Sequence, residues 1–152
     1  VQLARALGAA KVFAIDINPK KIEIASRFGA IPVDPSEIRD VDVALELIGL
    51  PETMRQAVQS LGKMGRAALV GITEKTFDLA PYHEIINKEA EIIGVSDHLA
   101  SEIPELLELV RTGQLDLSHG IIRTIPLEAK AINESLDSLE SFGDDVRVVI
   151  TA

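Results

Sequence analysis

The chain has 152 residues, 47% of them hydrophobic, which is enough for one domain with a sizeable core but too short for two complete ones. It contains no cysteine, which excludes disulfides, cysteine zinc ligands and thiol nucleophiles. Its formal net charge of −9 disfavours nucleic acids and anionic membranes as partners, because both attract basic proteins.

The first expected element is a helix that is already under way at the first residue. In "VQLARALGAAK", Val1, Leu3, Ala4 and Leu7 recur near one face, and Gly8 suits the helix end. A helix that begins at residue 1 lacks its N-cap, so we expect the chain to be truncated. The alternative is a frayed natural terminus.

Strands and helices then alternate along the chain. Asn18 is an expected N-cap with Pro19 at the first helical position, Gly29 ends that helix, and Ser101 and Gly113 are expected to start and stop a later one. The expected strands are 12–16, 30–35, 41–49, 65–72, 91–97, 121–125 and 146–150, and the later helices are 19–28, 51–61, 81–90, 101–112 and 127–140. This rhythm, with strands apolar on both faces, predicts an α/β fold with a doubly wound parallel sheet.

The strand "VFAID" ends abruptly on a carboxylate, Asp16. Ligands of such sheets bind beyond the carboxyl ends of the strands. A carboxylate there can accept hydrogen bonds from both hydroxyls of an adenosine ribose, and it repels a 2′-phosphate, which favours NAD over NADP. Lys21, one helical turn further on, could reach the same ribose. Alternatively, Asp16 only helps to cap the helix and Lys21 is solvated; the residues alone leave both interpretations open.

Several segments, in this order, resemble the medium-chain dehydrogenase/reductase superfamily, specifically its zinc-dependent alcohol dehydrogenases. The segments are "VQLARALGAAKVFAIDINPKKIEIASRFGA", "DVALELIG", "LGKMGRAALVGI", "IIGVSD", "ELLELVRTGQLD" and "DDVRVVITA", and the resemblance extends over essentially the whole chain. In that family a G-x-G-x-x-G turn precedes the first segment, so the resemblance implies a Rossmann-like sheet lacking its first strand and glycine loop. It also implies a partial dinucleotide-binding domain over residues 1–97, and a segment over 98–152 that returns to the catalytic domain.

The resemblance implies cofactor-binding roles for ten residues along the chain. Asp16, Ile17 and Lys21 lie at the adenine and its ribose, and Ile48 and Gly49 line the adenosine side of the cleft. Val70, Gly71 and Ile72 lie beside the nicotinamide ribose. Ile93 meets the carboxamide, and Arg147 neutralises the pyrophosphate. For the apolar positions the alternative is core packing. For Arg147 it is an ion pair with Asp144 or Asp145.

The resemblance further implies that the parent enzyme moves a hydride between an alcohol or carbonyl substrate and NAD, with zinc polarising the oxygen. The zinc ligands of the family lie in an amino-terminal domain absent from this chain, so we expect neither catalytic nor metal-binding residues here. One alternative is a non-catalytic nucleotide-binding or interaction module, or a degenerate fragment. Another is a zinc-free quinone or enoyl reductase of the same superfamily, which Asp16 disfavours because such enzymes usually prefer NADP.

Four remaining expectations concern the histidines, the partners, the location and one alternative class of enzyme. His83, His98 and His119 lack metal-ligand spacing, so we interpret them as structural or solvated. The resemblance implies that strand 91–95 lies at a sheet edge and pairs with a second copy, which predicts a homodimer. With no apolar run long enough to cross a bilayer and no signal peptide, the cytoplasm is the default location. A methyltransferase is disfavoured, because "DDVRVVITA" does not show the pattern of a closing antiparallel hairpin.

Overall fold

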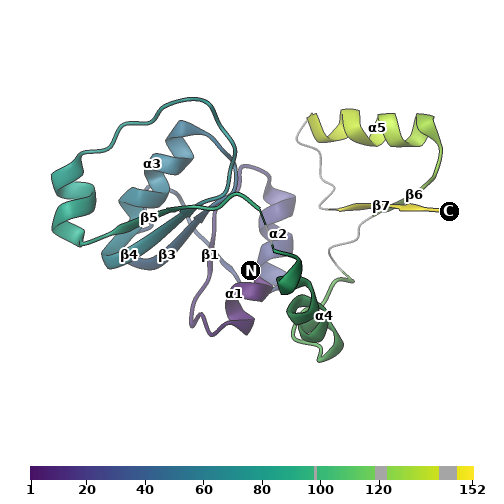
Figure 1. The fold of residues 1–152 in the computed structure, drawn as a ribbon, viewed down its shortest axis with the longest axis horizontal. Helices are drawn as coiled ribbons and strands as arrows, with labels where there is room; N and C mark the ends of the chain where they lie inside the picture. Colours follow the sequence, from purple (N-terminus) through teal and green to yellow (C-terminus); the bar gives the residue numbers. More distant parts are fainter. Residues whose placement is uncertain (98, 119–122, 141–146) are drawn as a thin grey trace. The chain divides into compact units, whose positions relative to one another are not determined.

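The computed structural model describes residues 1–97, 99–118, 123–140 and 147–152 (Figure 1). The chain divides into two compact units, one formed by residues 34–99 and the other by residues 1–33 together with 100–152. Within the described ranges, no helix combines the length and apolar character needed to cross a membrane. The division of function at residues 97 and 98 that the sequence suggests remains a prediction.

The unit of residues 34–99 is built on a three-stranded parallel sheet. Its order is β3 (Val41–Glu46), β4 (Leu61–Leu69) and β5 (Glu91–Gly94), and α3 (Pro51–Ser60) connects β3 to β4 and contacts both strands (Figure 1). Strand β4 begins four residues before its predicted start, because α3 ends at Ser60 and Leu61 already pairs with Val41. The predicted helix 81–90 is instead a π-helical turn at Pro81–Ile85 and a 3₁₀ turn at Ile86–Lys88.

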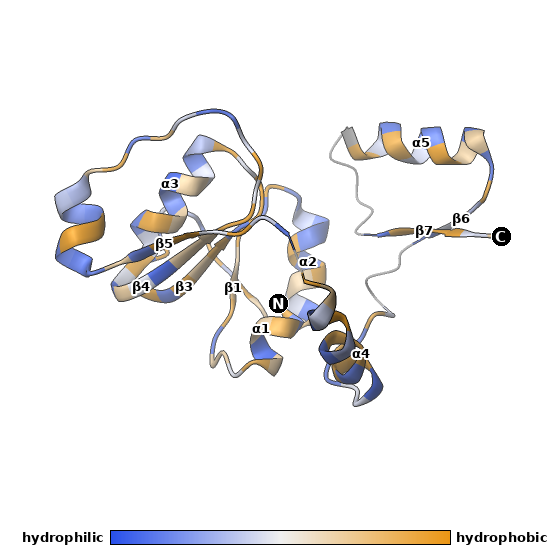
Figure 2. Ribbon diagram, in the orientation of Figure 1, coloured by the Kyte–Doolittle hydropathy of each residue, from blue (hydrophilic) through white to orange (hydrophobic). Residues whose placement is uncertain are grey.

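The core of this unit lies between α3 and the sheet. Val58 of α3 packs with Leu61 and Ala67, and all three side chains are buried. In Figure 2 the apolar colour recurs along α3 and along the strands beneath it. The prediction that the strands are covered on both faces is wrong for β3, where Val43 and Leu45 are 57% and 58% exposed. Alternate residues of a strand point to opposite faces, and α3 covers only one of these faces.

The other unit begins with α1 (Gln2–Ala6), β1 (Phe13–Ala14), α2 (Pro19–Arg27) and β2 (Ile31–Pro32), and β1 pairs with β2 in parallel. The start of α2 confirms the prediction, because the Asn18 side chain accepts a hydrogen bond of 2.9 Å from the Lys20 N–H and Pro19 occupies the first turn. Gly29, with φ of +85°, follows the helix as expected, since a positive φ favours glycine.

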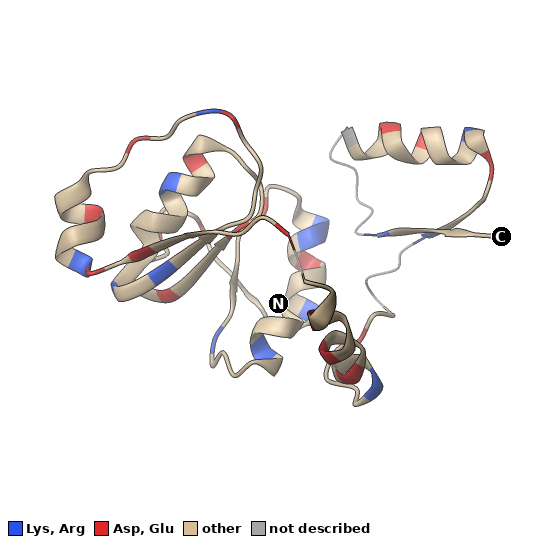
Figure 3. Ribbon diagram, in the orientation of Figure 1, with Lys and Arg blue, Asp and Glu red and all other residues tan. Residues whose placement is uncertain are grey.

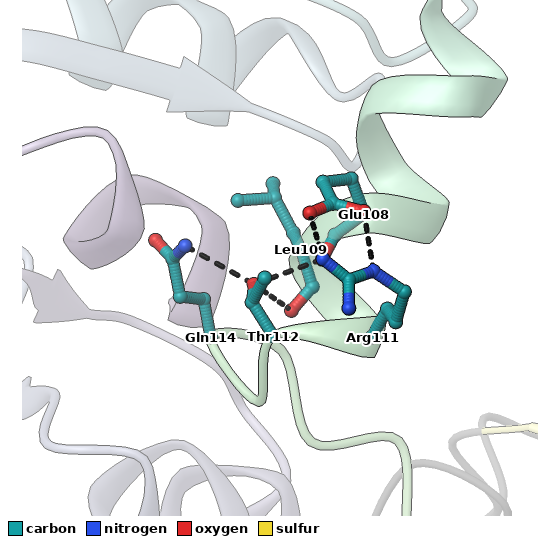
Figure 4. Close-up of polar contacts among 5 residues, drawn as sticks. All are labelled: Glu108, Leu109, Arg111, Thr112 and Gln114. Carbon is teal, nitrogen blue, oxygen red and sulfur yellow. Dashed lines mark hydrogen bonds and ion pairs between the residues drawn. The ribbon is translucent and has the colours of Figure 1, made fainter.

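Helix α4 (Ile103–Arg111) follows a 3₁₀ turn at Ala100–Glu102. The prediction that Ser101 is the N-cap of this helix is therefore wrong, because Glu102 occupies that position. Near its carboxyl end, two guanidinium nitrogens of Arg111 contact both carboxylate oxygens of Glu108 at 2.6 and 2.7 Å (Figure 4). These bonds lower the pKa of Glu108 and raise that of Arg111. The Thr112 hydroxyl donates to the Glu108 carbonyl at 2.8 Å, and Gly113, with φ of +75°, ends the helix as predicted.

The last elements are β6 (Arg123–Pro126), α5 (Ala129–Glu140) and β7 (Val148–Thr151). Strands β6 and β7 pair in parallel, with Ile125 opposite Ile150, which argues against the antiparallel ending of a methyltransferase. Parts of the predicted strands 121–125 and 146–150 lie outside the described residues. The parallel α/β class is confirmed, although the described strands pair in three sheets and not in one.

Charged residues are interspersed along the helices. Figure 3 shows both acidic and basic positions on α2 and on α3. On α2, Arg27 and Glu23 form an exposed ion pair at 2.6 Å, one turn apart. Such an exposed pair contributes little to stability, on the order of 0.3–0.5 kcal/mol.

Candidate functional site

The junction between β1 and α2 presents an open carboxylate next to an exposed apolar side chain. Asp16 Oδ1 accepts a hydrogen bond of 2.8 Å from the Asn18 N–H, so part of this carboxylate does support the helix start. Across the described chain, no partner of its Oδ2 is seen, and the residue is exposed. Ile17 is 90% exposed, and Lys21 is half-buried in the first turns of α2. The structure therefore brings together the three residues predicted for the adenosine end.

The turns that follow β3 and β4 are joined by a residue that the sequence analysis missed, Glu46. Its carboxylate Oε1 accepts hydrogen bonds from the Ile48 N–H and the Gly49 N–H, both at 2.9 Å, and from the Thr53 hydroxyl at 2.7 Å. Its main-chain carbonyl accepts from the Val70 N–H at 2.8 Å and from the Gly71 N–H at 3.1 Å. One residue at the end of β3 thus holds both turns.

The carboxyl group of Glu46 is removed from water. The residue is only 3% exposed, and its Oε2 is a buried atom with no hydrogen-bond partner among the described residues. A buried acceptor without a donor costs about 1–3 kcal/mol, and such groups in native proteins call for an explanation. The available signal in the sequence was an acidic residue in the otherwise apolar stretch 43–49, three positions before the strand-end Gly49.

Two glycines let the same turns approach each other closely. Gly49 has φ of +86°, and a Cβ added there would lie 2.5 Å from the Ile72 carbonyl oxygen. A Cβ added to Gly71 would lie 2.1 Å from the Gly49 nitrogen. Both contacts are with backbone atoms, so only glycine fits either position. Beyond the turns, Ile48 is exposed and Ile72 is 94% exposed.

The remaining residues predicted to bind the cofactor are Val70, Ile93 and Arg147. Val70 is half-buried, and Ile93 lies exposed in β5, in the same unit as the two turns. Arg147 is exposed directly before β7, while Asp144 and Asp145, its alternative ion-pair partners, lie outside the described residues. The structure therefore collects Ile48, Gly49, Val70, Gly71 and Ile72 around the strand-end turns of one unit, and Asp16, Ile17 and Lys21 at one junction of the other.

The described residues do not fit a zinc site. Among them no group of three or more His, Cys, Asp or Glu side chains could hold a metal ion. The ring of His83 packs edge-on against that of Tyr82, with centroids 5.2 Å apart. His98 and His119 lie outside the described residues.

A second buried carboxylate, Glu84, anchors the segment that leads from β4 to β5. Its two oxygens accept hydrogen bonds from Gln59 Nε2 and from the Ala80 N–H, both at 2.6 Å. Burial raises the pKa of Glu84. The two hydrogen bonds and the charges of Arg55 and Lys88 outweigh this effect, and the pKa falls below its ordinary value.

This lowered pKa predicts a loss of stability in acid. Between the native and the unfolded pKa of Glu84, the unfolded state binds more protons, so its contribution to stability is present above the unfolded pKa and is lost as pH falls through the native pKa. We expect the urea midpoint to decrease from pH 6 to pH 3, and Glu84→Gln to flatten this decrease. An equally steep decrease in the variant would contradict the assignment.

Parallel strands, crossover helices and glycine turns at the strand ends define an α/β protein of the Rossmann-like class. The sequence profile of the zinc-binding dehydrogenase family matches residues 1–112, and the chain belongs to this family. The resemblance to zinc-dependent members of the medium-chain dehydrogenase/reductase superfamily is thereby confirmed.

Individual relatives agree with this assignment. The chain is 28% identical over 162 residues to (R,R)-butanediol dehydrogenase of Bacillus subtilis, covering 99% of the chain and 46% of the relative. It is 30% identical over 170 residues to an S-(hydroxymethyl)glutathione dehydrogenase of Escherichia coli, covering 99% of the chain and 45% of the relative. The chain thus spans about half the length of the curated relatives that it matches.

Solved structures give the same picture. The crystal structure of 2R,3R-butanediol dehydrogenase from Bacillus subtilis superposes with a TM-score of 0.88 at 28% identity, covering 99% of this chain and 46% of that one. A zinc-binding dehydrogenase from Sinorhizobium meliloti, solved bound to NADP, superposes with a TM-score of 0.84 at 25% identity, covering 100% of this chain and 48% of that one.

Proposed function

We propose that the chain is the NAD(H)-binding portion of a zinc-dependent alcohol dehydrogenase, whose parent enzyme transfers a hydride between an alcohol and NAD. The observation that carries this proposal is the open Asp16 carboxylate, which lies two residues after the end of β1 and next to the exposed Ile17. A carboxylate with a free oxygen suits two ribose hydroxyls, and an exposed isoleucine suits the face of an adenine ring.

The other proposed contacts follow from the strand-end turns. Ile48 and Gly49 line the adenosine side, and Val70, Gly71 and Ile72 lie beside the nicotinamide ribose. Gly49 and Gly71 let the two turns pack backbone against backbone, which fixes the surface that the turns offer to a ligand. Ile93 meets the carboxamide, and Arg147 supplies positive charge for the pyrophosphate. When bound, the nicotinamide supplies the carbon that gives or takes the hydride.

The zinc and the substrate pocket belong, in this proposal, to the half of the relatives that the chain does not match. The chain's own residues bind and orient the cofactor. NAD is preferred over NADP because the Asp16 carboxylate repels a 2′-phosphate. The NADP bound to the Sinorhizobium meliloti protein makes this preference the point to test.

The direct test is a fluorescence titration of NADH with the chain. The chain has no tryptophan, so nicotinamide emission is read without that background. We expect the emission to increase saturably and to be reversed by competing ADP-ribose, which lacks only the nicotinamide of the cofactor. Unchanged NADH emission at millimolar concentrations of the chain would reject the proposal for this chain.

A homodimer through β5 is the proposed assembly. The strand lies at one edge of its sheet, and Ile92, Ile93 and the following Val95 are exposed. An apolar edge strand that remains unpaired invites association with another strand. A cytoplasmic location stays a prediction from the sequence.

Light scattering tests the dimer. Val95 donates its N–H to Leu69 of β4, so by the alternation along a strand the Ile92 N–H is not used in this pairing. Ile92→Pro removes that N–H, and we expect it to shift the mass toward the monomer. A wild-type chain that stays monomeric at high concentration would refute the dimer.

A further inference from the structure

We propose that Glu46 is a positioning residue that sets the shape of the two cofactor-binding turns, and this inference rests on the dinucleotide-binding function proposed above. The side chain is buried and touches the turns through hydrogen bonds. Its part in binding is to fix where the neighbouring backbone lies.

Glu46 connects the two turns through hydrogen bonds of its side chain and its backbone. The carboxylate oxygen Oε1 fixes the first turn through the N–H groups of Ile48 and Gly49, and it also binds the Thr53 hydroxyl in α3. The carbonyl oxygen of the same residue fixes the second turn through the N–H groups of Val70 and Gly71. Because Glu46 is the last residue of β3, its backbone is itself held by pairing with β4. Both turns are thus fixed to the same residue of the sheet, Glu46 at the end of β3.

The Glu46 carboxylate also fills space between the two turns. A Cβ added to Gly71 would lie 2.7 Å from Glu46 Oε2 as well as 2.6 Å from the Gly49 Cα, so these three groups fill a common volume. A displacement of the carboxylate therefore leaves a void between the two glycines. The turns can then shift, because close packing between them fixes their separation together with the hydrogen bonds.

The two oxygens of the Glu46 carboxylate differ in their surroundings. Only Oε1 of the carboxylate has donors, and Oε2 is buried without one in the described chain. A residue serving stability alone would gain from an apolar or fully paired side chain at this position. Local cost of this kind is typical of places where the surrounding structure serves a binding site.

The test compares Glu46→Gln with the matched control Asp42→Asn, which changes an exposed acid on the same strand. Three quantities are measured in the 152-residue chain: the urea midpoint, the NADH dissociation constant, and the amide signals of Ile48, Gly49, Val70 and Gly71 in a ¹⁵N-labelled sample. We expect Glu46→Gln to weaken NADH about fivefold or more and to shift the signals of both turns, while the control does neither.

The outcomes separate the two proposals. If Glu46→Gln lowers the urea midpoint yet binds NADH as the wild type does, Glu46 serves stability alone and the inference is overturned. If the wild-type chain binds no NADH, the proposed function fails, and the amide signals still decide the positioning role. Movement at Val70 and Gly71 together with Ile48 and Gly49 supports that role, and movement confined to one turn overturns it.

A second variant covers the case in which Glu46→Gln does not fold. Thr53→Val keeps the shape of the side chain but removes its hydroxyl donor to Oε1. We expect a smaller change in the same direction, with weaker NADH binding and shifted signals in both turns. Wild-type affinity together with unshifted signals in this variant would overturn the inference.

Discussion

Gly71→Ala is expected to lower the free energy of unfolding by about 2–4 kcal/mol and to weaken NADH binding strongly. The new Cβ would lie 2.1 Å from the Gly49 nitrogen and 2.6 Å from its Cα, distances that real Cβ atoms do not adopt. Neither atom belongs to a side chain that could rotate away, so the turns after β3 and β4 must separate. Urea denaturation measures the first effect, and NADH fluorescence measures the second.

The matched control is Gly94→Ala, at the end of β5. A Cβ added there meets no atom within 4 Å, and Gly94 is not among the glycines with a positive φ. We expect this variant to stay within about 0.5 kcal/mol of the wild type. Equal stability of the two alanine variants would show that the turns adapt freely, and the described geometry of the site would then be wrong.

Asp16→Asn is expected to weaken NADH binding about 10- to 100-fold while leaving NADPH binding nearly unchanged. The substitution removes the charge that strengthens two hydrogen bonds to the ribose, and it also removes the repulsion of a 2′-phosphate. The asparagine oxygen can still accept from the Asn18 N–H, so the start of α2 is preserved. Titrations of NADH and of NADPH with the wild-type chain and with the variant give the ratio of the two dissociation constants for each protein.

Asp137→Asn provides the control, because it neutralises an exposed acid on α5 and changes the net charge by the same amount. Any general effect of charge on an anionic cofactor appears in both variants. If the two variants bind NADH and NADPH alike, Asp16 is merely part of a helix start, and the assignment of the adenosine end must be abandoned.

Local signals predicted the elements whose ends are fixed by neighbouring residues. Asn18, Pro19 and Gly29 delimit α2 through hydrogen bonds and backbone angles that involve only adjacent positions, and the structure shows each of them. Ser101 failed as a cap because residues 100–102 form a 3₁₀ turn ahead of α4, a local alternative that its residue type does not exclude.

Features that depend on contacts between distant parts of the chain could not be predicted from the sequence. Glu46 acquires its importance from Val70 and Gly71, which are more than twenty positions away along the chain, and no pattern within β3 announces those contacts. The apolar run of β3 predicted burial, yet Val43 and Leu45 are exposed, because burial depends on what packs over a face. The hydropathy of a strand indicates that its faces can be buried, but it does not indicate whether another element packs over them.

The water-facing side of β3 carries a practical consequence for handling the protein. Sulfate and phosphate are excluded from protein surfaces and strengthen the association of apolar ones. Val43 and Leu45 offer such a surface, so ammonium sulfate is expected to precipitate the chain at an unusually low concentration. Replacing both residues with threonine, which suits a strand, should raise that threshold.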